Sequence, residues 1–243
     1  MRIGVIADIH VNLEALTAVL NELKKQGIDR LFVVGDLVGY GADPGPCIDL
    51  VMNEEPTVVA GNHDWAAVGK ADIAAFNEAA RIAVLCTTSQ LSDAQAAVLA
   101  DLCLELRQDD VHLVHASPCL PDRWDYLIDL YDARRAISCS DRKICVVGHS
   151  HVPFIYARGE EGEMFVDEAG MYAIQPGWRY LVNVGSIGQP RDGNAQSSVV
   201  IIDQSEAALH LLRVPYQVER AQAKIRAVPE LPEFLAQRLA WGY

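Results

Sequence analysis

The sequence predicts a mixed α/β protein, built as a four-layer α-β-β-α sandwich of two mixed sheets flanked by helices. In the first sixty residues, short β-branched runs alternate with helical patterns, whereas after residue 151 successive strands dominate. Alternation followed by consecutive strands indicates a mixed sheet system instead of one parallel sheet. Of the 243 residues 51% are hydrophobic, and no linker or low-complexity tract interrupts them. We therefore expect a single domain over residues 1–243.

The expected elements follow the hydrophobic pattern along the chain. A buried strand over 2–7 leads into an amphipathic helix over 12–26, which Asn12 can cap and Gly27 can end. Further strands are predicted at 31–34, 57–60, 111–114, 144–147, 152–157, 171–174, 180–184, 197–203 and 207–213, and further helices at 47–53, 130–137 and the C-terminal tail.

Residues 64–107 are rich in Ala, Leu and Glu and are predicted to form a helical cover. The expected break lies near 87–92, where Ser92 and Gln95 form a capping box for a helix that runs to about Cys103. Loops and insertions on a rigid scaffold often set specificity, so this cover could form one wall of a substrate cleft.

Composition narrows the range of functions. The formal net charge is −13 and the chain has no basic stripe, which argues against long DNA or RNA as a partner. An acidic protein can still bind a small phosphoester if bound cations reverse the local field. No stretch approaches the ~20 apolar residues that span a bilayer, so no membrane association is expected. The six cysteines form no C-x-x-C pair and are expected to be reduced, which indicates a cytoplasmic protein.

Five predicted strands are each followed by residues that bind metals. These residues are Asp8 and His10, then Asp36, then Asn62 with His63 and Asp64, then His115, and finally His149 and His151. Open α/β sheets gather their ligand sites at the carboxyl ends of strands. A single Asp after a strand is usually a cap or turn residue, but five such ends in order predict a metal site.

The residue types indicate which metals fit. Asp, Asn and His suit Mn²⁺, Fe or Zn²⁺, and no cysteine lies in these motifs. A carboxylate such as Asp36 can bridge two ions about 3.5–4 Å apart, and such a pair lowers the pKa of a bridging water and clamps phosphate oxygens during in-line attack.

The ordered motifs D-x-H, G-D, G-N-H-D, H and G-H-x-H, from residue 8 to about 192, resemble those of the calcineurin-like metallophosphoesterases. The chain looks most like the small prokaryotic phosphodiesterase-type members of that superfamily. The resemblance implies two divalent ions, with Mn first and Fe, Zn or Ni as alternatives. It implies that Asp8, His10 and His151 hold the first ion, that Asp36 bridges, and that Asn62, His115 and His149 complete the second site.

The resemblance also implies that His63 is not a ligand. It would face the leaving-group oxygen as a general acid or help to neutralise the phosphate, and Asp64 would orient it. Members that act on phosphoproteins carry an arginine after the G-D motif, and this chain has Leu37-Val38-Gly39 there. Arg123 could supply a phosphate contact, and Arg191 could bind substrate or lie at a subunit boundary. Tyr40 could stack on a base.

These residues leave more than one function open. Hydrolysis of a small phosphodiester or nucleotide-type phosphoanhydride is the leading hypothesis, with a small phosphoester or nucleotide as partner. The alternatives are a broad phosphomonoesterase or protein phosphatase, and a non-catalytic scaffold of the same fold. A homo-oligomer is compatible with the sequence. His112 and His210 lie outside the motifs and are expected to be structural.

Overall fold

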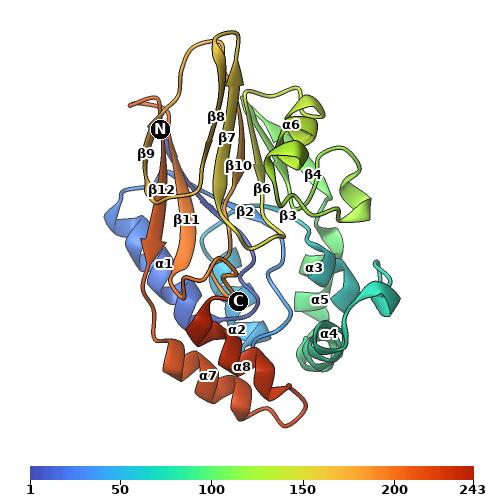
Figure 1. The fold of residues 1–243 in the computed structure, drawn as a ribbon. Coiled ribbons are helices and arrows are strands. Elements are labelled where there is room, and N and C mark those ends of the chain that lie inside the picture. The colour runs from blue at the N-terminus through green and yellow to red at the C-terminus, as the bar shows by residue number, and fades with distance from the viewer.

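The computed structural model describes all 243 residues and contains two six-stranded sheets, which Figure 1 shows side by side. The first sheet has the order β3-β2-β1-β11-β12-β9, formed by Thr57–Val59, Arg30–Val34, Arg2–Ile6, Ser197–Asp203, Ala208–Val214 and Gly170–Ala173. The second has the order β4-β5-β6-β10-β7-β8, formed by Glu105–Gln108, Val111–Val114, Ile144–Val147, Arg179–Asn183, Phe154–Gly159 and Gly162–Val166.

Each sheet is mixed. In the first, β1, β2 and β3 are parallel, and β11 joins β1 in the antiparallel direction. In the second, β5, β6 and β10 are parallel, whereas β4, β7 and β8 pair antiparallel with their neighbours. The parallel strands of both sheets end beside one another, and this arrangement positions the site described below.

Side-chain alternation on β1 explains why the two sheets stack. Ile3 and Val5 point into the core between the sheets, whereas Ile6 points to the opposite face of the first sheet. All three are buried, because helices cover that opposite face. Each such aliphatic side chain contributes about 1.5–3 kcal/mol when it is removed from water.

Helices form the two outer layers. Helices α1 (Leu13–Lys25) and α2 (Pro44–Met52) pack on the first sheet, and α6 (Leu130–Ser138) packs on the second. Asn12 caps α1, since its side chain accepts a hydrogen bond from the N–H of Ala15 at 3.1 Å. The predicted sandwich of two mixed sheets between helices is confirmed.

Near the lower edge of Figure 1, the C-terminal helices α7 (Val218–Arg226) and α8 (Glu233–Trp241) pack against each other. They share a hydrophobic cluster with α4 (Glu78–Gln90) and Tyr40. None of the helices is both long and apolar enough to cross a membrane.

The helical cover is shorter and more broken than predicted. It consists of α3 (Asn62–Ala67), a 3-10 turn at Ile73–Ala75, α4 and α5 (Asp93–Asp101), and the chain then becomes the edge strand β4. The break expected near 87–92 is present, since α4 ends at Gln90 and α5 begins at Asp93. The capping box of Ser92 and Gln95 is present at the start of α5.

Two further predictions are wrong. Strand β8 was missed because it is a short, largely exposed hairpin partner of β7. Cys119 and Cys139 form a disulfide, although all six cysteines were expected to be reduced. The other four cysteines are free as expected: Cys47, Cys86 and Cys145 are buried, and Cys103 is exposed.

Candidate metal centre

The carboxyl ends of parallel strands from both sheets meet and bring seven polar side chains together. Asp8 and His10 follow β1, Asp36 follows β2, Asn62 follows β3, His115 follows β5, and His149 and His151 follow β6. All seven are buried. Side chains of these types are normally buried only when they are paired or bind a metal.

The backbone is bent sharply at these positions. Of the eleven non-glycine residues with positive φ, eight lie at or beside the site: Asp8, His10, Val11, Asp36, Tyr40, Trp124, His149 and His151. Residues of these types in the left-handed region cost about 1 kcal/mol or more each, and such strain collects at functional sites. The strand ends are therefore shaped to direct side chains inward.

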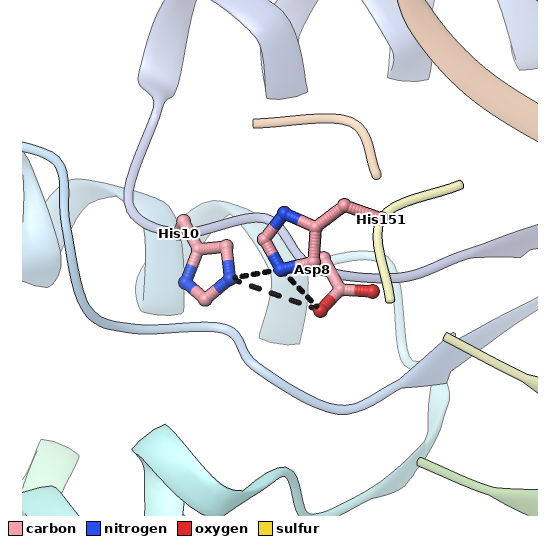
Figure 2. A group of neighbouring side chains, drawn as sticks. All are labelled: Asp8, His10 and His151. Atoms are coloured by element: carbon pink, nitrogen blue, oxygen red, sulfur yellow. Dashed lines mark hydrogen bonds and ion pairs between the residues drawn. The ribbon is translucent and has the colours of Figure 1, made fainter. Parts of the chain in front are cut away.

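Asp8, His10 and His151 form the first group, shown in Figure 2. Nδ1 of His10 lies 2.9 Å from the carbonyl oxygen of Val38, and Nδ1 of His151 lies 2.6 Å from that of Gln189. A carbonyl oxygen only accepts, so each Nδ1 carries the proton and each neutral ring turns a lone pair outward at Nε2.

Those two lone pairs face each other. The Nε2 atoms of His10 and His151 are 3.1 Å apart, and they lie 3.7 and 3.2 Å from Oδ1 of Asp8. Burial lowers the pKa of both histidines well below the usual value, so neither supplies a proton to share. Three electron-rich atoms that converge without a donor between them form a ligand set for a cation.

Asp36, His115 and His149 form the second group. Nδ1 of His115 donates to the carbonyl oxygen of Val34 at 2.8 Å, which leaves Nε2 directed inward, 3.3 Å from Oδ2 of Asp36. The same Oδ2 atom lies 3.6 Å from Nε2 of His10. One oxygen of Asp36 therefore stands between the two groups, as a bridging carboxylate requires.

The two aspartates are fixed in the same way. Oδ2 of Asp8 accepts the N–H of His149, and Oδ1 of Asp36 accepts the N–H of His63, each at 2.9 Å. The other oxygen of each remains free for the site. Gly61 allows this approach, because a Cβ there would lie 2.0 Å from Oδ1 of Asp36.

Several buried polar atoms of the seven side chains have no hydrogen-bond partner. They are Oδ1 of Asp8, Oδ1 of Asn62 and Nε2 of His149. An unsatisfied buried polar atom costs about 1–3 kcal/mol, so a native site that holds three of them calls for an explanation. Two divalent cations fit the donor set, since carboxylate, amide and imidazole ligands suit Mn²⁺, Fe and Zn²⁺.

Neighbouring charges shift the pKa values of Asp36 and His115 in opposite directions. Burial alone would raise the pKa of Asp36, but His115, His63 and His10 outweigh it and hold that pKa well below its usual range. Burial opposes protonation of His115, but Asp36 and Asp8 raise its pKa to about 10. A cation bound between His115 and Asp36 would therefore compete with a proton for the same position.

His63 lies beside the centre and is not part of either group. Its ring centroid is 5.0 Å from that of His10, 4.6 Å from that of Tyr40 and 4.9 Å from that of Phe76. Burial first, and Arg191 among its neighbours, lower the pKa of His63 to about 4. His63 is therefore a neutral imidazole at neutral pH, with Nδ1 unpartnered.

The expected role of Asp64 in orienting His63 is wrong. Its carboxylate accepts the N–H of Val38 at 3.1 Å and the N–H of Gly61 at 2.9 Å, and it makes no bond to His63. Burial, followed by Asp36, raises the pKa of Asp64 to about 7. Asp64 holds the turn before α3 and the loop after β2 together.

Arg191 lies beside the first ligand group. Its N–H donates to the carbonyl oxygen of His151 at 3.2 Å, and its guanidinium carbon lies 5.7 Å from the ring centroid of Tyr40. Arg191 forms no ion pair, and its buried Nε has no partner. Tyr40 is buried, 4.6 Å from the ring of His10.

A second arginine, Arg238 on α8, was not among the predicted site residues. Burial and the neighbouring Arg191 lower its pKa to about 10, and its charge also affects His151. Its Nε donates to the main-chain oxygen of Tyr243, and its guanidinium carbon lies 5.1 Å from the ring centroid of Phe234. The only signal in the sequence was a lone arginine in a helical tail, and the packing of α8 places it near the centre.

A cavity of about 660 Å³ opens beside the centre and reaches Asn62, His63 and His149. Arg123 and Tyr40 also line it, and so do Trp124 and Tyr126, which the sequence analysis missed. The spacing W-D-Y after the strand-end His115 was the available signal. His112 lies outside the centre as predicted, with Nδ1 3.0 Å from the Ser140 hydroxyl and Nε2 3.0 Å from Glu105.

The sequence and the fold were compared with those of known proteins. A family described as the calcineurin-like phosphoesterase superfamily domain matches residues 1–207. An uncharacterized protein of Methanocaldococcus jannaschii is 38% identical over 244 residues, which cover 99% of this chain and 98% of that relative.

Two solved structures have the same fold along the whole chain. A metallophosphoesterase from Sphaerobacter thermophilus is 35% identical with a TM-score of 0.87, and the match covers 100% of this chain and 99% of that one. A hypothetical protein from Pyrococcus horikoshii is 20% identical with a TM-score of 0.80, covering 100% and 98%. This chain belongs to the calcineurin-like phosphoesterase superfamily.

Proposed function

We propose that this protein is a dinuclear metal-dependent phosphoesterase that hydrolyses a small phosphodiester or a nucleotide-type phosphoanhydride. The observation that carries the proposal is the position of Asp36, whose Oδ2 lies 3.6 Å from Nε2 of His10 and 3.3 Å from Nε2 of His115. One oxygen shared by two ligand groups is the arrangement that holds two ions close together. Mn²⁺ is the proposed ion, with Fe, Zn²⁺ and Ni²⁺ as the alternatives to test.

Two divalent ions in these groups would lower the pKa of a water molecule and neutralise phosphate oxygens. The protein itself supplies the geometry. Asp8 and Asp36 are each locked by a backbone N–H, so their free oxygens are preorganised. Arg191, which has no carboxylate partner, is placed to bind the non-bridging oxygens of the substrate.

His63 is assigned to the leaving-group oxygen. With a pKa of about 4 it is neutral, but a neutral imidazole still carries one N–H that can donate to the ester oxygen. Transfer of the full proton becomes favourable as negative charge develops on that oxygen during bond cleavage. His63 therefore acts late in the reaction, when the leaving group most needs the proton.

The test measures metal content and hydrolysis together. The metal-loaded protein is assayed against bis-p-nitrophenyl phosphate, p-nitrophenyl phosphate, cyclic nucleotides and dinucleoside polyphosphates, with Mn²⁺, Ni²⁺, Mg²⁺ or chelator. His63→Ala should retain both ions and lower kcat by roughly 10²–10⁴, the usual effect of losing an acid/base group. Asp36→Asn should lose metal, because a bridging ligand loses its charge.

His112→Gln is the matched control, because His112 is buried and belongs to neither ligand group, with its ring nitrogens 3.0 Å from Ser140 and Glu105. It should retain ions and activity. Unchanged turnover in His63→Ala would remove His63 from the mechanism, and full occupancy by both ions in Asp36→Asn would contradict the bridging role. A metal-loaded protein that cleaves no substrate of the panel would favour a scaffold.

A further inference from the structure

The cavity beside the metal centre has walls of unusual composition. It lies within the 300–1,000 Å³ range of small-molecule sites, at about 660 Å³. One wall comes from the helical cover and includes Trp65 and Phe76, and the other comes from the loop after β5 and includes Trp124 and Tyr126. Segments remote in sequence thus bring aromatic rings to one space over Asn62.

The rings of the loop wall lie directly on the predicted metal ligands. Tyr126 stacks on His149, with ring centroids 4.1 Å apart and planes inclined by 27°. Trp124 lies with its ring 6.1 Å from that of His115 and 6.0 Å from that of Trp65. A group that extends from the metal centre into the cavity would therefore lie beside these rings.

Packing alone does not account for this wall. Tyr126 remains 52% exposed although one face covers His149, so its other face is free. Trp124 has a φ of 56°, a left-handed conformation that is rare for a bulky residue. A strained backbone that presents aromatic rings to a cavity is typical of a binding site.

Two cations complete the cavity. Lys70 lies with its ammonium 5.3 Å from the centroid of the Trp65 ring, and Arg123 directly precedes Trp124. Asp72 and Asp122 also line the cavity, so its charge is mixed, with no continuous positive track. This composition suits one planar group that carries few phosphates and does not suit a long strand.

We propose that this cavity binds the nucleobase of a nucleotide substrate, stacked on the free face of Tyr126 beside Trp124, while the phosphate lies at the metal centre. The inference rests on the proposed function and deepens it, because it names the organic part of the substrate. Stacking of a base on an aromatic side chain contributes about 1–3 kcal/mol, which corresponds to roughly 5–150-fold in affinity.

Binding tests the inference without any hydrolysis. AMP and ribose 5-phosphate share the phosphate and the ribose and differ in the base. Their Kd values are measured by calorimetry on the metal-loaded protein and on Tyr126→Ala and Trp124→Ala. Tyr131→Ala is the matched control, because Tyr131 is 71% exposed on α6 and does not line the cavity.

We expect AMP to bind at least 10-fold more tightly than ribose 5-phosphate. Tyr126→Ala should raise the Kd of AMP by roughly 5–150-fold and leave the Kd of ribose 5-phosphate unchanged. Tyr131→Ala should change neither ligand. Trp124→Ala repeats the test at a second position in case the first variant alters the loop.

Each result is decisive. Equal affinity for the two ligands, no measurable binding of AMP, or equal losses for both ligands in Tyr126→Ala would overturn the base-binding site, even if the protein hydrolyses phosphoesters. A base-dependent affinity in a protein that cleaves no ester would support the site and refute the proposed function. The two proposals can therefore fail separately.

Discussion

Gly39 sets the position of His63, and Gly39→Ala tests that dependence. A Cβ on Gly39 would lie 2.3 Å from Nδ1 of His63, where ordinary contacts begin at 3.4 Å. The imidazole would have to move by about 1 Å, and a shift of that size in a catalytic group can cost roughly 10²-fold in rate. We therefore expect kcat to fall about 100-fold with both ions retained.

The positive φ of Gly39 adds a separate cost in stability, and a control variant with the same backbone cost separates it from the clash. Gly39 has a φ of 93°, and an L-residue in such a conformation costs about 1–2 kcal/mol. Gly177 has a φ of 78° with no atom within 4 Å of its Cβ position, so Gly177→Ala carries the backbone cost without the clash.

Both variants should lower Tm by about 2–8 °C, and only Gly39→Ala should lower kcat. The assay is steady-state hydrolysis of bis-p-nitrophenyl phosphate, with metal content measured on the same samples. Full activity in a folded, metal-loaded Gly39→Ala protein would refute the placement of His63. Equal losses of activity in both variants would point to general destabilisation instead.

Three further predictions concern stability. Reduction of the bond between Cys119 and Cys139, which are 20 residues apart, should lower the free energy of unfolding by about 3 kcal/mol. Dithiothreitol should therefore lower the Tm of the parent protein and leave the Tm of the Cys119→Ser, Cys139→Ser double variant unchanged. Chelation should lower Tm, because bound metal at about 100 times its Kd stabilises the folded state by about 2.7 kcal/mol. An unchanged Tm on addition of chelator would contradict the predicted metal centre. Burial lowers the pKa of His112, so the folded protein takes up its proton at lower pH than the unfolded chain, and stability falls as pH drops below about 6.5. His112→Gln should therefore show a smaller loss of Tm between pH 8 and pH 5 than the parent, and parallel profiles would refute this assignment.

The strand ends explain why so much of the centre could be predicted from the sequence. Each apolar run stops at a polar residue, and parallel strands that neighbour one another bring such residues to one edge. Asp8, Asp36 and His115 follow β1, β2 and β5 and meet in this way. The local sequence was therefore enough to predict which residues lie at the metal centre.

Residues that depend on tertiary packing could not be predicted. Arg238 reaches the centre only because α8 packs on α4 and α7, which no local pattern shows. Strand β4 has no β-branched residue and exists because it pairs with β5, for example Glu105 opposite Val114. Asp64 has the right type and place for a partner of His63, but backbone N–H groups compete for its oxygens.

The hydrogen bond from the N–H of His149 to Asp8 has a consequence for how ions enter and leave. It joins a loop of the first sheet to a loop of the second, so most of the ordering of the ligands is complete before any ion arrives. Metal uptake should then proceed with little change in heat capacity, because almost no apolar surface is newly buried. In the other direction, separation of the two sheets divides each ligand group between them, so both ions should dissociate in a single cooperative event.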